Sequence, residues 1–528
     1  MSQRFLKIKN FKNIGITKEE EQWERLYLNN SLDKDKIGEL IILIGENNVG
    51  KSNILDAINI ISVAEKQVYN MYHCIPDFMG YIDCLPKLKL VYIDDENNSY
   101  DLEINIDEYG KTKLIDNIAN KGIIKEKYGI DFIPNIHFYR EYHIGDKELI
   151  TTPKKIKDSK FFNSLFKAIN YRTSIITTAY EKAKTSPGYK DQYQDDINTK
   201  LKEIVDKKFN ELYFQDLGTQ EYSFDIKLEK DEIYLSMRKN GSIITLSKQS
   251  VGFKWFFNFF FNFIYTDKLK AGDIVLMDEP EIHLSIPGRR DLRKFIKKFA
   301  KDTGITFIAT THNPSFADID YLDELRIIKN NEDGIGVKIQ SNFSALADDE
   351  VDTLDSIINS FGILRIDLTR EYKIIFVEGI TDYNYLTAFK ILYNQNNEDK
   401  KLNIAFIPIY GLGKDDNEMH KKLDKLIQFK DAILLTDGDT RGNAFKKLCA
   451  EEKLKDKLTA IPLTEIDASF KNIENLFSQN DKEKFKDMIE NKSIEKSSPF
   501  KNSIAQLELD AKTVENFNKV LKYLNEMS

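Results

Sequence analysis

Residues 45 to 53 have the composition of a loop that binds phosphate groups. Gly45 begins the pattern G-x-x-x-x-G-K-S, with a strand-like apolar run before it and helical spacing after it. Glycines let backbone N–H groups surround phosphate oxygens, the lysine adds a positive charge, and the serine hydroxyl can ligate Mg2+. The pattern predicts a nucleotide site formed by Gly45, Asn47, Asn48, Gly50, Lys51, Ser52 and Asn53.

Two acidic residues follow another apolar run, residues 274–277. Asp278 is expected to hold the Mg2+ of a bound nucleotide, and Glu279 to polarise the water that attacks the γ-phosphate. This chemistry needs a second carboxylate directly beside the one that holds the metal. A further strand-like run, residues 305–309, leads through two threonines to His312.

Together these motifs resemble the ABC-type ATPases, and among them the soluble members related to chromosome-maintenance and recombination proteins. The segment Ser250-Val-Gly252 resembles the signature segment of that class. The resemblance implies that ATP and Mg2+ are the cofactors and that His312 is the switch histidine. It also implies that Ser250 and Gly252 reach the γ-phosphate of ATP held by a second protomer, and therefore that the protein forms a homodimer or a higher homo-oligomer.

The C-terminal third carries a second set of acidic residues, placed after the apolar runs 374–377 and 432–436. Carboxylates at the C-terminal ends of parallel strands can gather Mg2+ or Mn2+. Two such ions about 3.5–4 Å apart can activate a water and stabilise the leaving oxygen during phosphodiester cleavage. The acids in question are Glu378, Asp382, Asp437 and Asp439. For Asp382 the alternative is an exposed acid that the helix dipole favours.

This arrangement resembles a TOPRIM domain, and the chain as a whole resembles the OLD (overcoming lysogenization defect) family, in which an ABC-type ATPase is fused to a TOPRIM nuclease. The resemblance implies that Glu378, Asp437 and Asp439 are metal ligands and that Asp382 assists them. It further implies that Glu474 completes a second metal site. A surface helix acid is the alternative interpretation of Glu474.

The same resemblance implies a catalytic lysine near the C-terminus, which would stabilise charge on the transferring phosphate. Lys501 is the candidate, with Lys496 behind it. In a Lys-rich tail, a solvated lysine is the alternative.

The expected fold class is α/β, with two principal domains and a linker. Residues 1–345 are expected to form the ABC-type ATPase domain, and 155–215 a helical insertion within it that the resemblance assigns to dimerisation. Residues 346–370 are polar and acidic and are expected to connect the domains. Residues 371–528 are expected to form the Rossmann-like TOPRIM nuclease domain.

Composition limits the class of protein. A chain of 528 residues is too long for one hydrophobic core. Its net charge of -8 does not favour nucleic-acid binding by overall charge, so any DNA contact must come from local patches. The three cysteines are scattered, which argues against a disulfide framework. The chain lacks an apolar run long enough to cross a membrane and a signal-peptide core, so a cytoplasmic protein without membrane contact is expected.

The function expected from these features is that of an ATP-binding, ATP-regulated and metal-dependent endonuclease that cleaves or nicks DNA. The OLD resemblance implies a role in antiviral (anti-phage) defence, alone or with a helicase or reverse-transcriptase partner. Two alternatives stay open. One is a TOPRIM nuclease that acts on RNA such as tRNA, and the other is an ATP-driven DNA-binding clamp or sensor without nuclease activity.

Overall fold

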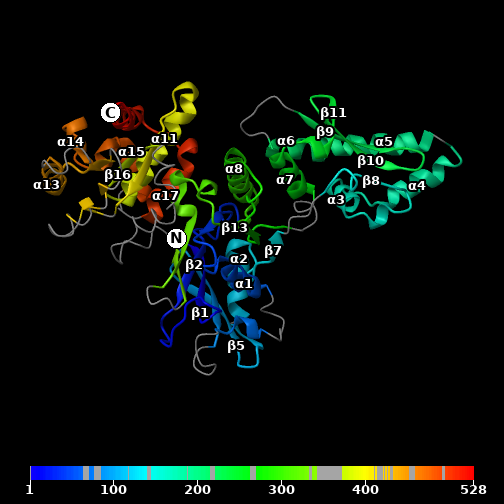
Figure 1. Ribbon diagram of the computed structural model, residues 1–528, viewed down its shortest axis with the longest axis horizontal. Helices are drawn as coiled ribbons and strands as arrows, with labels where there is room; N and C mark the ends of the chain where they lie inside the picture. The colour runs from blue at the N-terminus through cyan, green and yellow to red at the C-terminus, as the bar shows by residue number, and fades with distance from the viewer. Residues whose placement is uncertain are drawn as a thin grey trace. The chain divides into compact units, whose positions relative to one another are not determined.

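In the computed structural model, the chain forms two compact units. Figure 1 labels the helices and strands of the chain. The first comprises Met1–Leu43, Asn48–Phe316 and Asn330–Lys338, and the second Ile44–Asn47, Ala317–Lys329 and Ile339–Ser528. The structure describes residues 2–62, 71–76, 85–116, 118–139, 144–186, 188–213, 221–261, 269–331, 336–341, 372–409, 411–412, 420, 423–424, 426–427, 432–450, 458–489 and 494–527. The expected connector, 346–370, and Cys84 lie outside these ranges, whereas Cys74 and Cys449 are buried free thiols.

One layer of the first unit is a five-stranded antiparallel sheet in the order β2-β1-β4-β5-β6. Its strands are β1 (Gln3–Lys9), β2 (Glu24–Asn29), β4 (Lys87–Ile93), β5 (Ser99–Ile106) and β6 (Thr112–Asp116). Buried and partly exposed residues alternate along most of β5, as expected for a strand with one face on the core. The N-terminal strand thus belongs to the first unit.

The central strands of the first unit follow one another in the order β3-β13-β12-β7. They are β3 (Leu40–Ile44), β7 (Ile136–Tyr139), β12 (Ile274–Asp278) and β13 (Thr306–Thr311). β12 runs parallel to both β13 and β7. All residues of β3 and β13 are buried, which accounts for their continuous apolar runs, because a strand covered on both faces has no solvent side.

Helices accompany these strands. The helix α1 (Lys51–Ile61) follows β3, and α8 (Ile286–Thr303) connects β12 to β13. The aromatic helix α7 (Val251–Phe259) precedes β12. Because β12 and β13 are parallel neighbours, Asp278 at the end of β12 is paired with Thr310, the residue before the last of β13. The residues that follow the two strands therefore emerge at the same edge of the sheet.

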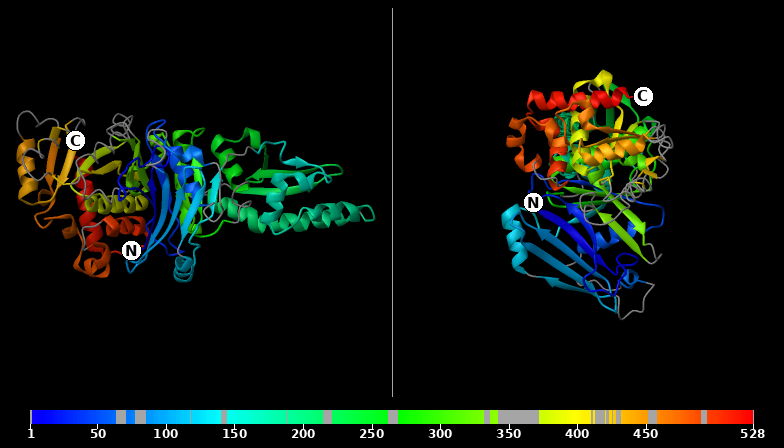
Figure 2. Two further views of the ribbon diagram at one scale, coloured as in Figure 1. Left: turned by 90° about the horizontal axis from the view of Figure 1, so that it is seen from below. Right: turned by 90° about the vertical axis from the view of Figure 1, so that its left-hand side faces the viewer.

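The described residues of the range 155–215 are largely helical. It contains α3 (Lys160–Ala168), α4 (Ser174–Ala183), α5 (Gly188–Lys200), a π-helical turn η3 (Leu201–Asp206) and α6 (Lys207–Tyr213). These helices accompany a small antiparallel sheet of β8 (Ile150–Thr151), β9 (Tyr222–Leu228), β10 (Ile233–Lys239) and β11 (Ser242–Ile244). α5 contacts both α4 and β9 (Figures 1 and 2). We call residues 150–244 the arm.

Phe209 on α6 is the centre of an aromatic core between the arm and α7. Its ring lies 4.8 Å from that of Phe224 on β9 and 5.0 Å from that of Phe256 on α7. Edge-to-face rings at these separations add stabilisation beyond burial alone. The arm is therefore packed directly on α7, the helix that Ser250 caps.

Strand β9 pairs with β10 along one side, and helical side chains bind the other side. Four backbone N–H groups of β9 donate to these side chains. Leu228 donates to Gln194 and Ile226 to Asn198, both at 2.8 Å. Phe224 donates to Asp206 at 3.1 Å, and Tyr222 donates to Asn210 at 2.9 Å. These side chains take the place of a further strand. Because they satisfy the backbone of an edge, they also keep it from pairing with another chain.

The second unit contains a parallel sheet in the order β17-β16-β18-β19. Its elements are β16 (Lys373–Val377), α11 (Ile380–Asn396), β17 (Ile404–Pro408), β18 (Ala432–Thr436), α13 (Thr440–Cys449), β19 (Leu458–Pro462), α17 (Ile494–Ser503) and α18 (Ala511–Glu526). The strand order reverses between β16 and β18. In open α/β sheets, ligands bind at such a switch point, outside the carboxyl ends of the strands.

Residues 317–329 belong to the second unit, although the sequence places them in the ATPase domain. They form the 3-10 helix η7 (Ile319–Glu324) and most of β14 (Leu325–Asn330). β15 (Val337–Ser341) lies at the boundary of the units. No helix in the described ranges is long and apolar enough to cross a membrane.

The buried Asp206 makes the stability of the arm depend on pH. Burial raises the pKa of this carboxyl to about 7, against about 3.9 in an unfolded chain. The unfolded state therefore loses its proton first, and the free energy of unfolding falls as the pH rises from about 4 to about 7. Asp206→Asn should abolish this fall and stabilise the protein at pH 8 by about 1–3 kcal/mol, measured by denaturant unfolding.

Asp195→Asn is the matched control, because Asp195 is an exposed acid on α5. Its substitution should leave the pH profile unchanged. A profile for Asp206→Asn that still falls between pH 4 and 7 as in the wild type would contradict the assignment.

Candidate functional site

The phosphate-binding loop connects β3 to α1 and ends in a left-handed turn. Gly50 has φ 101° and Asn48 has φ 65°. A Cβ atom on Gly50 would lie 2.8 Å from the side-chain nitrogen of Asn13, so both the backbone angle and the space require glycine. Within the ranges that the structure describes, no side chain caps the N-terminus of α1. Its first N–H groups are therefore oriented as in an anion site.

The structure brings Ser52 at the start of α1 close to Asp278 at the end of β12. The hydroxyl oxygen of Ser52 lies 3.4 Å from Oδ2 of Asp278. Oδ1 of the same carboxylate accepts a hydrogen bond of 2.5 Å from Thr310. A hydroxyl and a carboxylate at this separation fit the Mg2+ that accompanies ATP, since both supply oxygen ligands.

The side chain of Lys51 is buried close to three acidic residues. Burial lowers its pKa, while the negative charges of Glu279, Asp278 and Glu281 act in the opposite direction. Its ammonium group is thus held in an acidic environment, where a triphosphate would supply further negative charge. The predicted residues Gly45 and Asn47 lie on the same loop, before Asn48.

Glu279 has the geometry expected of a positioned base. Its backbone is left-handed, with φ 45°, which is unfavourable for a residue with a side chain. Its N–H donates to the hydroxyl of Thr310 at 3.0 Å, and its Oε1 lies 2.8 Å from Nδ1 of His312. The sequence predicted both Glu279 and His312 as catalytic residues, and the structure places them in direct contact.

Three residues at this edge of the sheet, Thr310, Thr311 and Glu281, were not predicted as site residues from the sequence. Thr310 binds both the Asp278 carboxylate and the Glu279 N–H. Thr311 donates its hydroxyl to the buried Glu281, and burial raises the pKa of this carboxyl. Among the residues that the structure describes, the other oxygen of Glu281 has no hydrogen-bond partner. The available signal was the pair of threonines directly before His312, at the end of a buried strand.

Asn53, which the sequence predicts as a nucleotide-site residue, forms hydrogen bonds with the turn after β1. Its amide nitrogen donates to Asn13 at 2.8 Å, and its amide oxygen accepts from Lys12 at 3.3 Å. These contacts fix the turn after β1 against α1. The structure therefore gives Asn53 a supporting role that the motif does not reveal.

The predicted signature residues lie at the start of α7. The hydroxyl of Ser250 accepts from the N–H of Phe253 at 3.2 Å, which is an N-cap. Val251 is 51% exposed, and no atom of the described residues lies within 4 Å of the position that a Cβ atom on Gly252 would occupy. This turn thus has the open surface that contact with a second protomer would require.

In the second unit, the acids predicted from the sequence gather at the switch point. Oε1 of Glu378, after β16, accepts a hydrogen bond of 2.8 Å from the backbone N–H of Asp437, after β18. Asp382, in the first turn of α11, accepts from the N–H of Gly379 at 2.7 Å. Asp439 caps α13 by accepting from the N–H of Gly442 at 2.7 Å.

Burial and three nearby acidic residues shift the pKa of Asp382. Burial raises its pKa well above the ordinary value, and the negative charges of Asp437, Glu378 and Glu474 raise it further. Glu474 lies on a short 3-10 helix (Ile473–Leu476), and one of its buried oxygens has no hydrogen-bond partner in the described part of the chain. Four carboxyl groups from three separate segments therefore interact at one edge of the sheet.

These acids are not arranged as a finished metal site. Across the described ranges, no group of three or more His, Cys, Asp or Glu side chains is placed to hold a metal ion. Glu378, Asp382 and Asp439 each have one oxygen bound to a backbone N–H. The buried oxygen of Glu474, which has no partner among the described residues, and the mutual repulsion of the carboxylates nevertheless fit a divalent cation, which would neutralise them.

Lys501 differs from the expectation. Its ammonium group is fully buried and forms an ion pair of 2.6 Å with Asp323, and it lies 3.4 Å from the hydroxyl of Tyr383. The alternative that Lys501 is solvated is therefore wrong. Its ammonium group interacts with Asp323 and Tyr383 of the protein itself. The side chain of the second candidate, Lys496, lies outside the described part of the chain.

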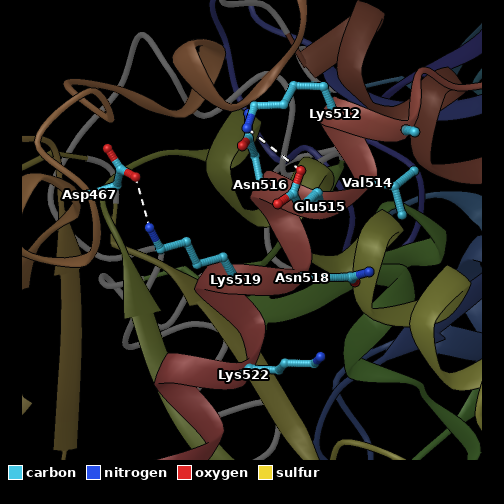
Figure 3. A pocket seen from close by; sticks show the side chains of 9 residues that line it. Asp467, Lys512, Val514, Glu515, Asn516, Asn518, Lys519 and Lys522 are labelled. Carbon is cyan, nitrogen blue, oxygen red and sulfur yellow. Dashed lines mark hydrogen bonds and ion pairs between the residues drawn. The ribbon is translucent and has the colours of Figure 1, made fainter.

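A separate shallow depression lies on the surface of α18 (Figure 3). Lys512, Lys519 and Lys522 line it, and Lys519 pairs with Asp467 at 2.8 Å. None of the acids at the switch point lines this depression. It is distinct from the candidate metal site.

Comparison with protein families identifies an ATPase domain. Residues 142–317 match the family described as AAA ATPase domain. The matched range contains Ser250, Asp278, Glu279 and His312, and it begins after the phosphate-binding loop. No curated protein matches the chain.

Among solved structures, the chain is similar to head domains of SMC proteins. The SMC head domain from Thermotoga maritima has 17% identity and a TM-score of 0.34, covering 65% of this chain and 99% of that one. An Smc head bound to the C-winged helix domain of ScpA has 15% identity and a TM-score of 0.38, covering 65% and 98%. The Smc head with an extended coiled coil, in complex with the C-terminal domain of ScpA derived from Pyrococcus furiosus, has 15% identity and a TM-score of 0.36, covering 69% and 100%.

The contact of Glu279 with His312 generates a prediction. Glu279→Gln should keep the shape of the site but remove the base, so we expect ATP turnover to fall by about 10²–10⁴-fold. ATP affinity should stay near that of the wild type, because Lys51 and the loop are unchanged. Steady-state phosphate release and titration with a fluorescent ATP analogue measure the two quantities. Turnover within about twofold of the wild type would exclude Glu279 as the base.

Proposed function

We propose that this protein is an ATP-regulated, metal-dependent endonuclease of the OLD type, with a TOPRIM-like nuclease centre in its second unit. The observation that carries the proposal is the contact between Glu378 and the backbone of Asp437 at the point where the strand order reverses. Acids from two distant parts of the chain meet there, at the position where open α/β sheets bind their ligands.

The ATPase unit supplies the regulatory half of the proposal. Lys51 and the loop would bind the phosphates of ATP, while Ser52 and Asp278 would hold its Mg2+. Glu279, positioned by His312 and Thr310, would orient the water for hydrolysis. Ser250 and Gly252 would complete the site of a second protomer, which makes the protein a homodimer or a higher homo-oligomer.

At the switch point, Glu378, Asp437 and Asp439 would hold a divalent cation, and Asp382 and Glu474 would assist. When bound, Mg2+ or Mn2+ lowers the pKa of a coordinated water and stabilises the oxygen that leaves the phosphorus. The chain contributes the position of the acids. The N–H of Asp437 fixes Glu378, the N–H of Gly379 fixes Asp382, and the N–H of Gly442 fixes Asp439.

DNA is the proposed substrate, and the OLD resemblance supports a role in antiviral defence, with or without a helicase or reverse-transcriptase partner. Metal-assisted cleavage uses the same ligands on DNA and RNA, so the acids do not by themselves select the polymer. The net charge of -8 requires that contacts to either polymer be local.

The proposal predicts that Asp437→Asn abolishes nicking of supercoiled DNA in Mg2+ or Mn2+, because a neutral amide is a poor ligand for these ions. The substitution keeps the backbone N–H that binds Glu378. We expect a loss of at least about 100-fold, with ATP binding retained. Gel assays of plasmid nicking, run alongside ATP titration, measure both.

Glu515→Gln is the matched control, since Glu515 is an exposed acid on α18. It should nick DNA at the wild-type rate. Parallel reactions with tRNA separate an RNA nuclease from a DNA nuclease. Equal nicking by Asp437→Asn and the wild type would overturn the nuclease proposal and favour an ATP-driven clamp.

A further inference from the structure

Residues 317–329, which begin five residues after the predicted switch histidine His312, belong to the second unit. His312 directly follows β13, the 3-10 helix η6 (Pro314–Phe316) comes next, and the chain then passes into the second unit at Ala317. The helix η7 follows without a long linker. The position of η7 is thus tied along the chain to the residue that contacts Glu279.

Within the second unit, two buried lysines hold η7. Lys390 on α11 pairs with Asp320 at 2.5 Å and also donates to the carbonyl of Ile404 at 2.7 Å. Lys501 on α17 pairs with Asp323 at 2.6 Å. Both ammonium groups are removed from solvent, so separating either pair would leave an uncompensated buried charge. The ion pairs therefore favour movement of η7 together with α11 and α17.

Tyr383 makes the most direct connection. Its hydroxyl donates to the carbonyl of Ile319 at 2.8 Å and accepts from the N–H of Leu322 at 3.1 Å, which are both backbone groups of η7. The ammonium group of Lys501 lies 3.4 Å from the same oxygen. One hydroxyl thus binds both ends of a helical turn.

Tyr383 is also the neighbour of Asp382 in the first turn of α11. Asp382 interacts with Asp437, Glu378 and Glu474. A displacement of η7 would pull on Tyr383 and so on the turn that sets the position of Asp382.

We infer that η7 transmits the nucleotide state of the ATPase site to the acidic site, and that Tyr383 is the positioning residue that receives it. Occupation of the ATP site changes the contact of His312 with Glu279, and the chain carries this change through η6 to η7. The hydroxyl of Tyr383 then passes it to the first turn of α11. The inference rests on the proposed function for its biological meaning, but the physical coupling can be measured without cleavage.

The test is hydrogen exchange of the full-length protein with and without a non-hydrolysable ATP analogue and Mg2+. In the wild type, the analogue should change the exchange of amides in the phosphate-binding loop and in residues 383–386 of α11, the latter by about fivefold or more. Tyr383→Phe removes only the hydroxyl. It should retain the change in the loop and reduce the change in α11 to about twofold or less.

Tyr385→Phe is the matched control, because Tyr385 is a buried tyrosine on the same helix whose hydroxyl donates to the carbonyl of Met488 instead of to η7. The exchange response of α11 in Tyr385→Phe should equal that of the wild type. The melting temperature of this variant should shift by about as much as that of Tyr383→Phe. An α11 response of wild-type size in Tyr383→Phe, or no response in the wild type, would overturn the inference. Nicking assays on the same proteins report separately on the nuclease proposal, since the exchange measurement needs no nucleic acid.

Discussion

The constraint on which the second unit depends is repulsion between carboxylates held close together. Asp382, Glu378, Asp437 and Glu474 interact within one site, and burial adds to the cost of charging Asp382. Hydrogen bonds from backbone N–H groups offset part of this cost. Glycines at crowded positions let the backbone come close enough to form these hydrogen bonds. A Cβ atom on Gly442 would lie 2.1 Å from the carbonyl oxygen of Asp437, and one on Gly438 would lie 2.2 Å from Thr464. The remaining negative charge is what makes the site suited to a cation.

In the ATPase unit, hydrogen bonds to a single threonine position two neighbouring acidic residues. Thr310 binds the carboxylate of Asp278 and the backbone N–H of Glu279, so one hydroxyl orients the metal-holding acid and the base. Because Thr310 is the residue paired with Asp278 across two parallel strands, the sheet itself sets this geometry. The left-handed backbone of Glu279 is the conformational cost of turning its carboxylate toward His312.

Polar side chains also organise the arm, where a row of amides and one carboxyl binds the backbone of β9. The same strand contributes Phe224 to the aromatic core that reaches α7. The arm is thereby connected through side-chain packing to the turn that carries Ser250. The two ends of this connection are the places where the sequence, by resemblance, expects contacts to a second protomer.

The sequence by itself determined the buried strands and the acids that follow them, because a strand covered on both faces requires a continuous apolar run and a turn residue where it ends. It also determined the phosphate-binding loop, whose glycines and lysine act within one short segment. Only the tertiary structure decided the partners of Lys501, the supporting role of Asn53 and the membership of residues 317–329 in the second unit. These depend on residues far apart in the chain, such as Asp323 for Lys501. A lysine that is to be buried and a lysine that is to be solvated look alike until the fold supplies, or does not supply, the opposite charge.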